Sequence, residues 1–250
     1  MYFKWQNFIT LSKLFMKEQV YNLQSAANSS ASERAGFIRR TYAHLAVAIL
    51  GFIAVEYYLV HSPFAAKLAM SMTGGMSWLV VIGLFMGVSY VANKLAVSQT
   101  SQQMQYLGLG LFVVAQAIVF LPLLYIATFY GGEGVIATAG LMTLLLVGGI
   151  TATVFITKKD FSFMGSFLSI GGFVAFGFII CSMIFGFSLG LIFASVMVVF
   201  AGGAVLYSTS NVLHQHSPDQ HVAAALSLFA SVALLFFYIL QVLMSLSGRD

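Results

Sequence analysis

Long uncharged stretches dominate the chain and are separated by short polar or charged segments. A helix needs about 20 mostly apolar residues to cross the hydrocarbon layer of a bilayer. The sequence predicts seven such spans, at 44–61, 76–93, 106–130, 135–157, 163–187, 189–213 and 222–247. The uncharged stretch between Asp160 and Asp219 is too long for one crossing, so we divide it at the Gly-Phe-Ser-Leu-Gly segment 186–190. Continuous apolar runs predict helices, because barrel strands alternate apolar with polar residues.

Small residues recur at helical spacing within several of these spans. The small residues lie in the strings Gly83-Leu-Phe-Met-Gly87, Gly171-Gly172-Phe-Val-Ala175 and Gly202-Gly203-Ala204. Small side chains let helix backbones approach closely inside a membrane. We therefore expect close helix packing at these positions.

Composition supports an all-α integral membrane protein. Hydrophobic residues make up 60% of the chain and charged residues only 7%, whereas a soluble domain carries about 25% charged residues. So few charged residues exclude a cytosolic enzyme. A secreted disulfide scaffold is also excluded, because Cys181 is the single cysteine and cannot form an internal disulfide. The net charge of +4 does not indicate nucleic-acid binding, because the basic residues lie at span ends where membrane topology requires them.

The distribution of basic residues predicts the orientation of the spans. One side of the predicted membrane carries Arg34, Arg39, Arg40, Lys94, Lys158 and Lys159, and the other carries Lys67 and Arg249. Positive charge is enriched in cytoplasmic loops. We therefore expect a cytoplasmic N-terminus and, after an odd number of crossings, a C-terminus outside.

The first part of the chain differs in composition from the rest. Residues 22–34 are small and polar, so residues 1–34 are predicted to form a cytoplasmic N-terminal tail and residues 35–250 the seven-helix membrane domain. Within the tail, apolar residues fall loosely on one helical face: Phe3, Phe8, Leu11, Leu14 and Phe15. Two interpretations stay open, an interfacial helix or a true start at Met16.

Few residues inside the predicted spans have the chemistry of an active site. No carboxylate falls in the middle of a span; Glu56 lies near a predicted end, where we expect it to reach the outer interface in preference to forming an ion site at the outer mouth. The histidines lie at span ends or in a loop, and Asp160, Asp219 and Asp250 lie outside the spans. The sequence therefore indicates neither an intramembrane protease nor another enzyme, and it predicts no cofactor.

Three histidines cluster between the sixth and seventh spans, at His214, His216 and His221. With Asp219 they have the residue types of a zinc or nickel site. Histidine also titrates near neutral pH, so the loop would suit a pH sensor. The interpretation we favour is a solvated loop, because a metal site needs supporting hydrogen bonds that spacing alone does not provide.

Several strings resemble one known family. Arg39-Arg40-Thr41-Tyr42 opens the first span, Lys158-Lys159-Asp160-Phe161-Ser162 follows the fourth, and Leu206-Tyr207-Ser208-Thr209-Ser210-Asn211 ends the sixth. In this order they resemble the Bax inhibitor-1 (transmembrane Bax inhibitor motif) family from about residue 35 to the end. The resemblance implies a seven-helix fold in which Lys158, Lys159 and Asp160 form a family motif turn.

The resemblance also bears on function. One branch of the family conducts calcium in a pH-dependent way through a pair of aspartates, and the matching positions here are Ser208 and Ser231. Two hydroxyls neither share a proton as two carboxylates do nor ligate calcium as well. The chain is more similar to the bacterial branch that modulates the FtsH membrane protease. We therefore expect a non-enzymatic, multi-pass inner-membrane protein that acts on an FtsH-type ATP-dependent protease through its tail and spans; a calcium-permeable leak channel is the alternative.

Overall fold

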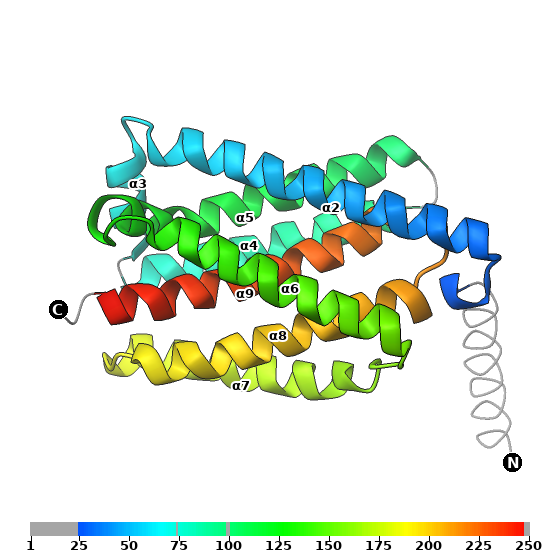
Figure 1. Ribbon diagram of the computed structural model, residues 1–250. Coiled ribbons are helices and arrows are strands. Elements are labelled where there is room, and N and C mark those ends of the chain that lie inside the picture. Colours follow the sequence, from blue (N-terminus) through cyan, green and yellow to red (C-terminus); the bar gives the residue numbers. More distant parts are fainter. Residues whose placement is uncertain (1–24, 74, 99–100, 248–250) are drawn as a thin grey trace, which may run out of the picture.

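The computed structural model describes residues 25–73, 75–98 and 101–247. A short 3₁₀ turn, η1 (Ala26–Asn28), precedes eight α-helices. They are α2 (Ala31–Val60), α3 (Ala65–Thr73), α4 (Gly75–Ala96), α5 (Gln102–Tyr130), α6 (Val135–Thr157), α7 (Met164–Phe185), α8 (Gly190–His214) and α9 (His221–Ser247). Figure 1 shows the long helices running roughly side by side in one bundle.

The predicted fold class is confirmed. Among the described residues, seven helices are long and apolar enough to cross a membrane, all but the short α3. The described residues do not include the expected interfacial helix, the alternative start at Met16, or Arg249 and Asp250. Which side of the membrane each terminus faces stays a prediction.

The first span begins well before its apolar stretch at His44. Ser30 and Glu33 form a capping box at the start of α2: the Glu33 N–H donates to Ser30 Oγ over 3.3 Å and the Ser30 N–H donates to Glu33 Oε2 over 3.2 Å. Such a box satisfies backbone donors that a helix start leaves free. The polar sequence around Ser30 therefore starts a helix.

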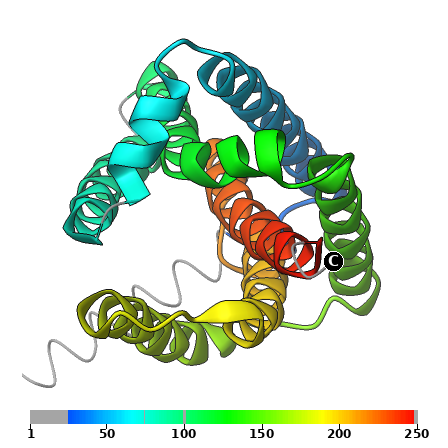
Figure 2. The same ribbon diagram turned by 90° about the vertical axis from the view of Figure 1, so that its left-hand side faces the viewer.

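Helix α9 is the centre of the bundle. It packs against α2, α5, α6 and α8 and is buried along most of its length, whereas α7 contacts mainly α8 and is exposed along most of its length. The view down the helices shows α9 surrounded and α7 at the periphery (Figure 2). The aromatic core lies where α2, α5 and α9 meet: the Phe52 ring is 5.2 Å from that of Phe120 and 6.0 Å from that of Phe229.

Close helix packing occurs at some of the predicted small residues. A Cβ added at Gly171 would lie 2.7 Å from the Phe200 ring, so α7 and α8 approach closely there. At Gly83 and Gly87 the prediction is wrong, because both residues are exposed and an added Cβ would meet nothing within 4 Å. The close approach of α4 and α5 falls instead at Gly108, where an added Cβ would lie 2.6 Å from the Ala92 carbonyl oxygen.

One end of the bundle carries most of its basic residues. The basic end is where α2, α5, α7 and α9 begin and where α4, α6 and α8 finish, and it carries Arg39, Arg40, Lys94, Lys158 and Lys159. The opposite end carries Lys67 and Glu133.

Candidate functional site

Ser208 and Ser231 face each other between α8 and α9 near the basic end. Both side chains are buried, and their Oγ atoms are 2.6 Å apart. Ser231 Oγ also donates to the Ser227 carbonyl oxygen over 2.8 Å. A hydroxyl has one proton, so Ser208 must be the donor in the pair, and Ser227 Oγ donates to Ser208 over 3.5 Å. The three hydroxyls form a chain that ends on a backbone carbonyl.

This chain of hydroxyls has little capacity to hold a cation. Each proton already has an acceptor inside the chain, and the pair contributes no negative charge. Calcium in proteins takes six to eight oxygen ligands, usually including carboxylates. Across the residues that the structure describes, no group of three His, Cys, Asp or Glu residues gathers as a metal site would need. Ser208 and Ser231 therefore act as a hydrogen-bonded contact between two helices.

The turn Lys158-Lys159-Asp160 packs against the end of α8. Lys158 ends α6 in the left-handed conformation, with φ of 52°. The Phe161 N–H donates to Ser210 Oγ over 2.9 Å, and Gln215 Nε2 donates to Ser162 Oγ over 3.1 Å. The two strings that carry most of the family resemblance are thus in direct contact.

Asp160 organises this turn. Its carboxylate accepts hydrogen bonds from the Ser162 N–H, over 2.8 Å, and from the Ser162 hydroxyl. Partial burial by itself would raise the pKa of Asp160, but the hydrogen bonds from Ser162, the nearby His214 and a hydrogen bond from Ser210 together hold that pKa below its ordinary value. Asp160 is therefore an anionic cap for the turn that joins α6 to α7.

The three histidines of the α8–α9 loop do not converge. His214 Nδ1 is 3.0 Å from the Ser210 carbonyl oxygen, and His216 Nδ1 is 3.0 Å from the Asn211 carbonyl oxygen. The His221 ring instead packs against His44 of α2, with ring centroids 4.9 Å apart. His214 and His216 contact the backbone at the end of α8, and His221, the first residue of α9, is buried against α2, so this connection is packed rather than fully solvated as expected.

The segment before α2 is anchored on this loop. Ala26 is fully buried, and its N–H donates to the His216 carbonyl oxygen over 2.9 Å. Arg34 Nη1 donates to the Ala27 carbonyl oxygen over 3.1 Å, and Arg40 Nη2 donates to the Pro218 carbonyl oxygen over 3.3 Å. The chain that enters α2 is therefore fixed against the α8–α9 loop, an anchor that the polar sequence gave no reason to expect.

The position of His216 makes this anchor sensitive to pH. Burial lowers the pKa of His216 below 6.5, with a smaller opposing effect from its hydrogen bond to Asn211. As the pH falls, this histidine is protonated in the unfolded chain before it is protonated in the folded protein, because its pKa is higher in the unfolded chain. Protonation therefore favours unfolding, and this contribution to stability is lost as the pH falls below about 6.5. We expect His216→Gln to reduce the fall in melting temperature between pH 7.5 and pH 5.5. The matched control is His61→Gln at the opposite, exposed end of α2; equal pH dependence in both variants would contradict the role of His216.

The prediction that Glu56 reaches the outer interface is wrong. The Glu56 side chain is only 4% exposed, and neither carboxylate oxygen has a hydrogen-bond partner among the residues that the structure describes. The reason is helical periodicity, since the buried face of α2 runs through Ala48, Phe52, Glu56 and Val60 at intervals of about one turn. That spacing was visible in the sequence and would have predicted an inward-facing acid.

The surroundings of Glu56 follow from the register of three helices. Phe52 contacts Phe120 of α5 and Phe229 of α9, and α2, α5 and α9 run in the same direction (Figure 1). One turn further along, Glu56 is level with Leu124 and Ala233, both of which are buried. At this level α5 and α9 therefore contribute buried apolar residues beside α2.

These features define a class of protein, a multi-pass α-helical membrane protein built around a buried final helix. Comparison with known proteins then gives the family. The sequence profile described as "Inhibitor of apoptosis-promoting Bax1" matches residues 34–248, and the chain belongs to this Bax inhibitor-1 family.

Relatives of this chain occur in bacteria and eukaryotes. The chain is 30% identical to an uncharacterised protein of Pseudomonas aeruginosa over 243 residues, which cover 94% of this chain and 100% of that protein. It is 29% identical to Protein LIFEGUARD 4 of Arabidopsis thaliana over 84% of each chain. It is 28% identical to Bax inhibitor 1 of Schizosaccharomyces pombe, over 93% of this chain and 85% of that protein.

Proposed function

We propose that this protein is a non-enzymatic modulator of an FtsH-type ATP-dependent protease in the bacterial inner membrane. The observation that carries the proposal is the anchor of η1 on the α8–α9 loop. Residues 1–24 are attached at Ser25, at the basic end of the bundle, and if fully extended they would reach roughly 80 Å from that point. Proteolysis concentrates at chain termini that are not held by the fold.

The membrane domain would resist unfolding once the protease has engaged the tail. Pulling on residue 24 loads η1, whose Ala26 is buried and hydrogen-bonded to the loop before α9. Helix α9 is the central and most buried span. A protease that holds the tail would therefore meet a tightly packed membrane domain, which favours slow processing and occupation of the protease at the expense of other substrates.

The neutral Ser208–Ser231 pair supports this assignment over the alternative. A calcium-permeable, pH-linked leak would need acidic groups that bind the ion and share a proton. The Ser208 hydroxyl donates to Ser231 Oγ, and the Ser231 hydroxyl donates to the Ser227 backbone carbonyl. The pair therefore favours a protein that acts by contact.

Deletion of residues 1–24, which keeps Ser25 and the η1 anchor, is the direct test. The tail and the spans form two linked attachments, and loss of one of two linked attachments weakens binding by about 100-fold or more. We expect the shortened protein to lose co-purification with the protease and to stop slowing degradation of a reporter substrate.

A scrambled version of residues 1–24 is the matched control, because it keeps length and composition. If the scrambled tail works as well as the native one, the protease grips the tail without reading its sequence. Unchanged co-purification and degradation kinetics after deletion would overturn the proposal.

A further inference from the structure

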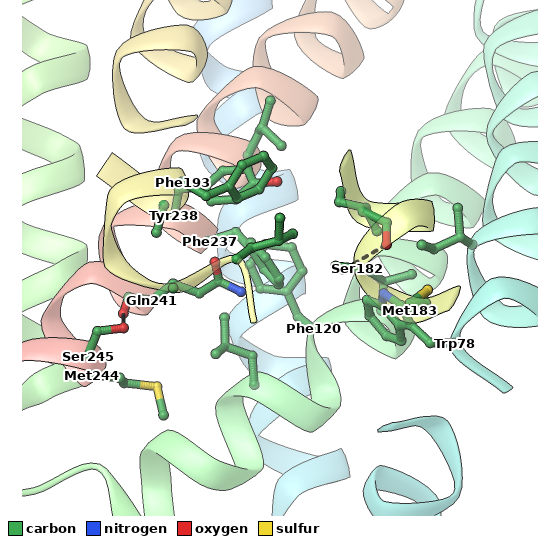
Figure 3. Close-up of a pocket in the computed structure, with 18 of the residues that line it drawn as sticks. Trp78, Phe120, Ser182, Met183, Phe193, Phe237, Tyr238, Gln241, Met244 and Ser245 are labelled. Carbon is green, nitrogen blue, oxygen red and sulfur yellow. Dashed lines mark hydrogen bonds between the residues drawn. The ribbon is translucent and has the colours of Figure 1, made fainter. Parts of the chain in front are cut away.

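A cavity of about 610 Å³ opens among five helices in the half of the bundle away from the basic end. Residues of α4, α5, α7, α8 and α9 line it. Figure 3 shows Tyr238 and Gln241 on one side of this space and Trp78 and Met183 on the other. The volume is within the range of small-molecule sites, roughly 300–1,000 Å³.

The cavity contains polar groups that the protein does not use. Gln116 and Tyr238 line it and are 8% and 6% exposed, and Gln241 and Trp78 line it with them. Within the described part of the chain, none of these four side chains forms a hydrogen bond; Gln241 accepts one from Ser245 only through its backbone oxygen. Buried polar groups are normally hydrogen-bonded. A ligand with oxygen atoms would satisfy them.

The chemistry of the lining restricts what that ligand is. None of the lining residues is charged, so the phosphate of a phospholipid would lie there without a counter-charge, at a large cost in desolvation. Most of the remaining lining residues are apolar, among them Ile82, Phe85 and Leu234. The site therefore suits an uncharged amphiphile with a hydrocarbon chain and several hydroxyl or carbonyl oxygens.

A second cavity gives this ligand a route toward the opposite end of the bundle. It has a volume of about 410 Å³, shares Trp78 and Gln241 with the first cavity, and reaches Thr73 at the end of α3. Gln241 lies at the junction, where an amide can both donate and accept hydrogen bonds. The polar part of an amphiphile would lie near this junction and its chain in the larger cavity.

From these observations we infer that the cavity lined by Gln116, Tyr238, Gln241 and Trp78 binds a neutral acylglycerol from the membrane. Its ester and hydroxyl oxygens match the unpartnered donors, and its chain matches the apolar wall. Occupation by a protein segment is a separate outcome that the experiments below distinguish. The inference is independent of the proposed protease interaction.

A groove between α7 and α8 is suited to lipid contact without polar recognition. It is larger, at about 1000 Å³, but its lining is apolar apart from Ser188. Hydrocarbon chains would fill it without any polar recognition. The acylglycerol site differs because its buried donors and acceptors distinguish a glyceride from a bulk phospholipid.

The indole of Trp78 is a natural reporter for this site. Replacing the other tryptophan, Trp5→Phe, leaves Trp78 as the single emitter. In phosphatidylcholine vesicles, we expect brominated monoacylglycerol to quench Trp78 more strongly than brominated phosphatidylcholine at equal bromine content. Combining Gln241→Leu with Tyr238→Phe should reduce that preference by about tenfold, the effect of losing one good hydrogen bond.

A second variant tests the cavity without removing its polar groups. Ser182→Phe fills the cavity from α7, and Ser169→Phe places the same ring on the exposed face of the same helix; each serine donates to its own helix backbone. Ser182→Phe should abolish the preference and Ser169→Phe should retain it. Equal quenching by the two probes would overturn the inference, and so would protection of Trp78 from both, which would mean that a protein segment fills the cavity.

Discussion

Changing both Ser208→Asp and Ser231→Asp is expected to destabilise the protein by about 3 kcal/mol or more at pH 8. The two Oγ atoms are 2.6 Å apart and buried, so two carboxylates there would repel each other and could be accommodated only by sharing a proton. Lowering the pH to 5 or adding millimolar calcium should restore much of the loss. Melting temperature in detergent, measured across pH with and without calcium, checks this result.

The uncharged double variant Ser208→Asn with Ser231→Asn is the matched control, since it has similar volume and no charge. It should show no added pH or calcium dependence. Calcium flux through the aspartate variant in dye-loaded vesicles would show that the fold contains a path for the ion. The native protein would then lack only the ion-binding carboxylates at positions 208 and 231. Stability of the aspartate variant that is independent of pH would contradict the close burial of the pair.

Replacing Glu56→Leu is expected to stabilise the protein by about 1–3 kcal/mol, the cost of burying polar groups without partners. Within the described part of the chain, both carboxylate oxygens of Glu56 lack hydrogen-bond partners, and the side chain is buried. Leucine is similar in size and removes the unsatisfied atoms. The change should appear as a higher melting temperature in detergent.

Glu133→Leu provides the comparison, because Glu133 is exposed in the loop between α5 and α6. Its effect should be within about 0.5 kcal/mol of zero. A loss of stability in Glu56→Leu would mean that the carboxyl group has a partner, such as a bound water or cation. That result would revive an ion-linked function.

The fold was predictable because membrane helices depend mainly on length and apolar character. All seven predicted spans correspond to helices in the structure. The start of α2 was not predicted, since the capping box at Ser30 and Glu33 resembles a polar linker when only composition is considered. Helix propensity and capping act over a few residues, and a hydropathy window does not detect them.

The site was less predictable because it depends on contacts between distant segments. Proximity to a span end suggested an interfacial Glu56, but the rotation of α2, set by Phe52 against Phe120 and Phe229, turns the carboxyl group inward. The contact between Ala26 and His216 joins segments far apart in sequence. This contact is a product of tertiary packing, which no local pattern encodes, whereas the inward position of Glu56 could have been inferred from the helical spacing of the buried face of α2.

The contact between the Lys158-Lys159-Asp160 turn and the end of α8 has a consequence for how relatives are compared. The Phe161 N–H donates to Ser210 and Gln215 donates to Ser162, so two of the strings on which the resemblance rests form a contact that joins the ends of α6, α7 and α8. Selection for that contact would preserve the signature whatever occupies the neighbouring position 208. Proteins that share these strings are therefore expected to share a skeleton while differing in chemistry.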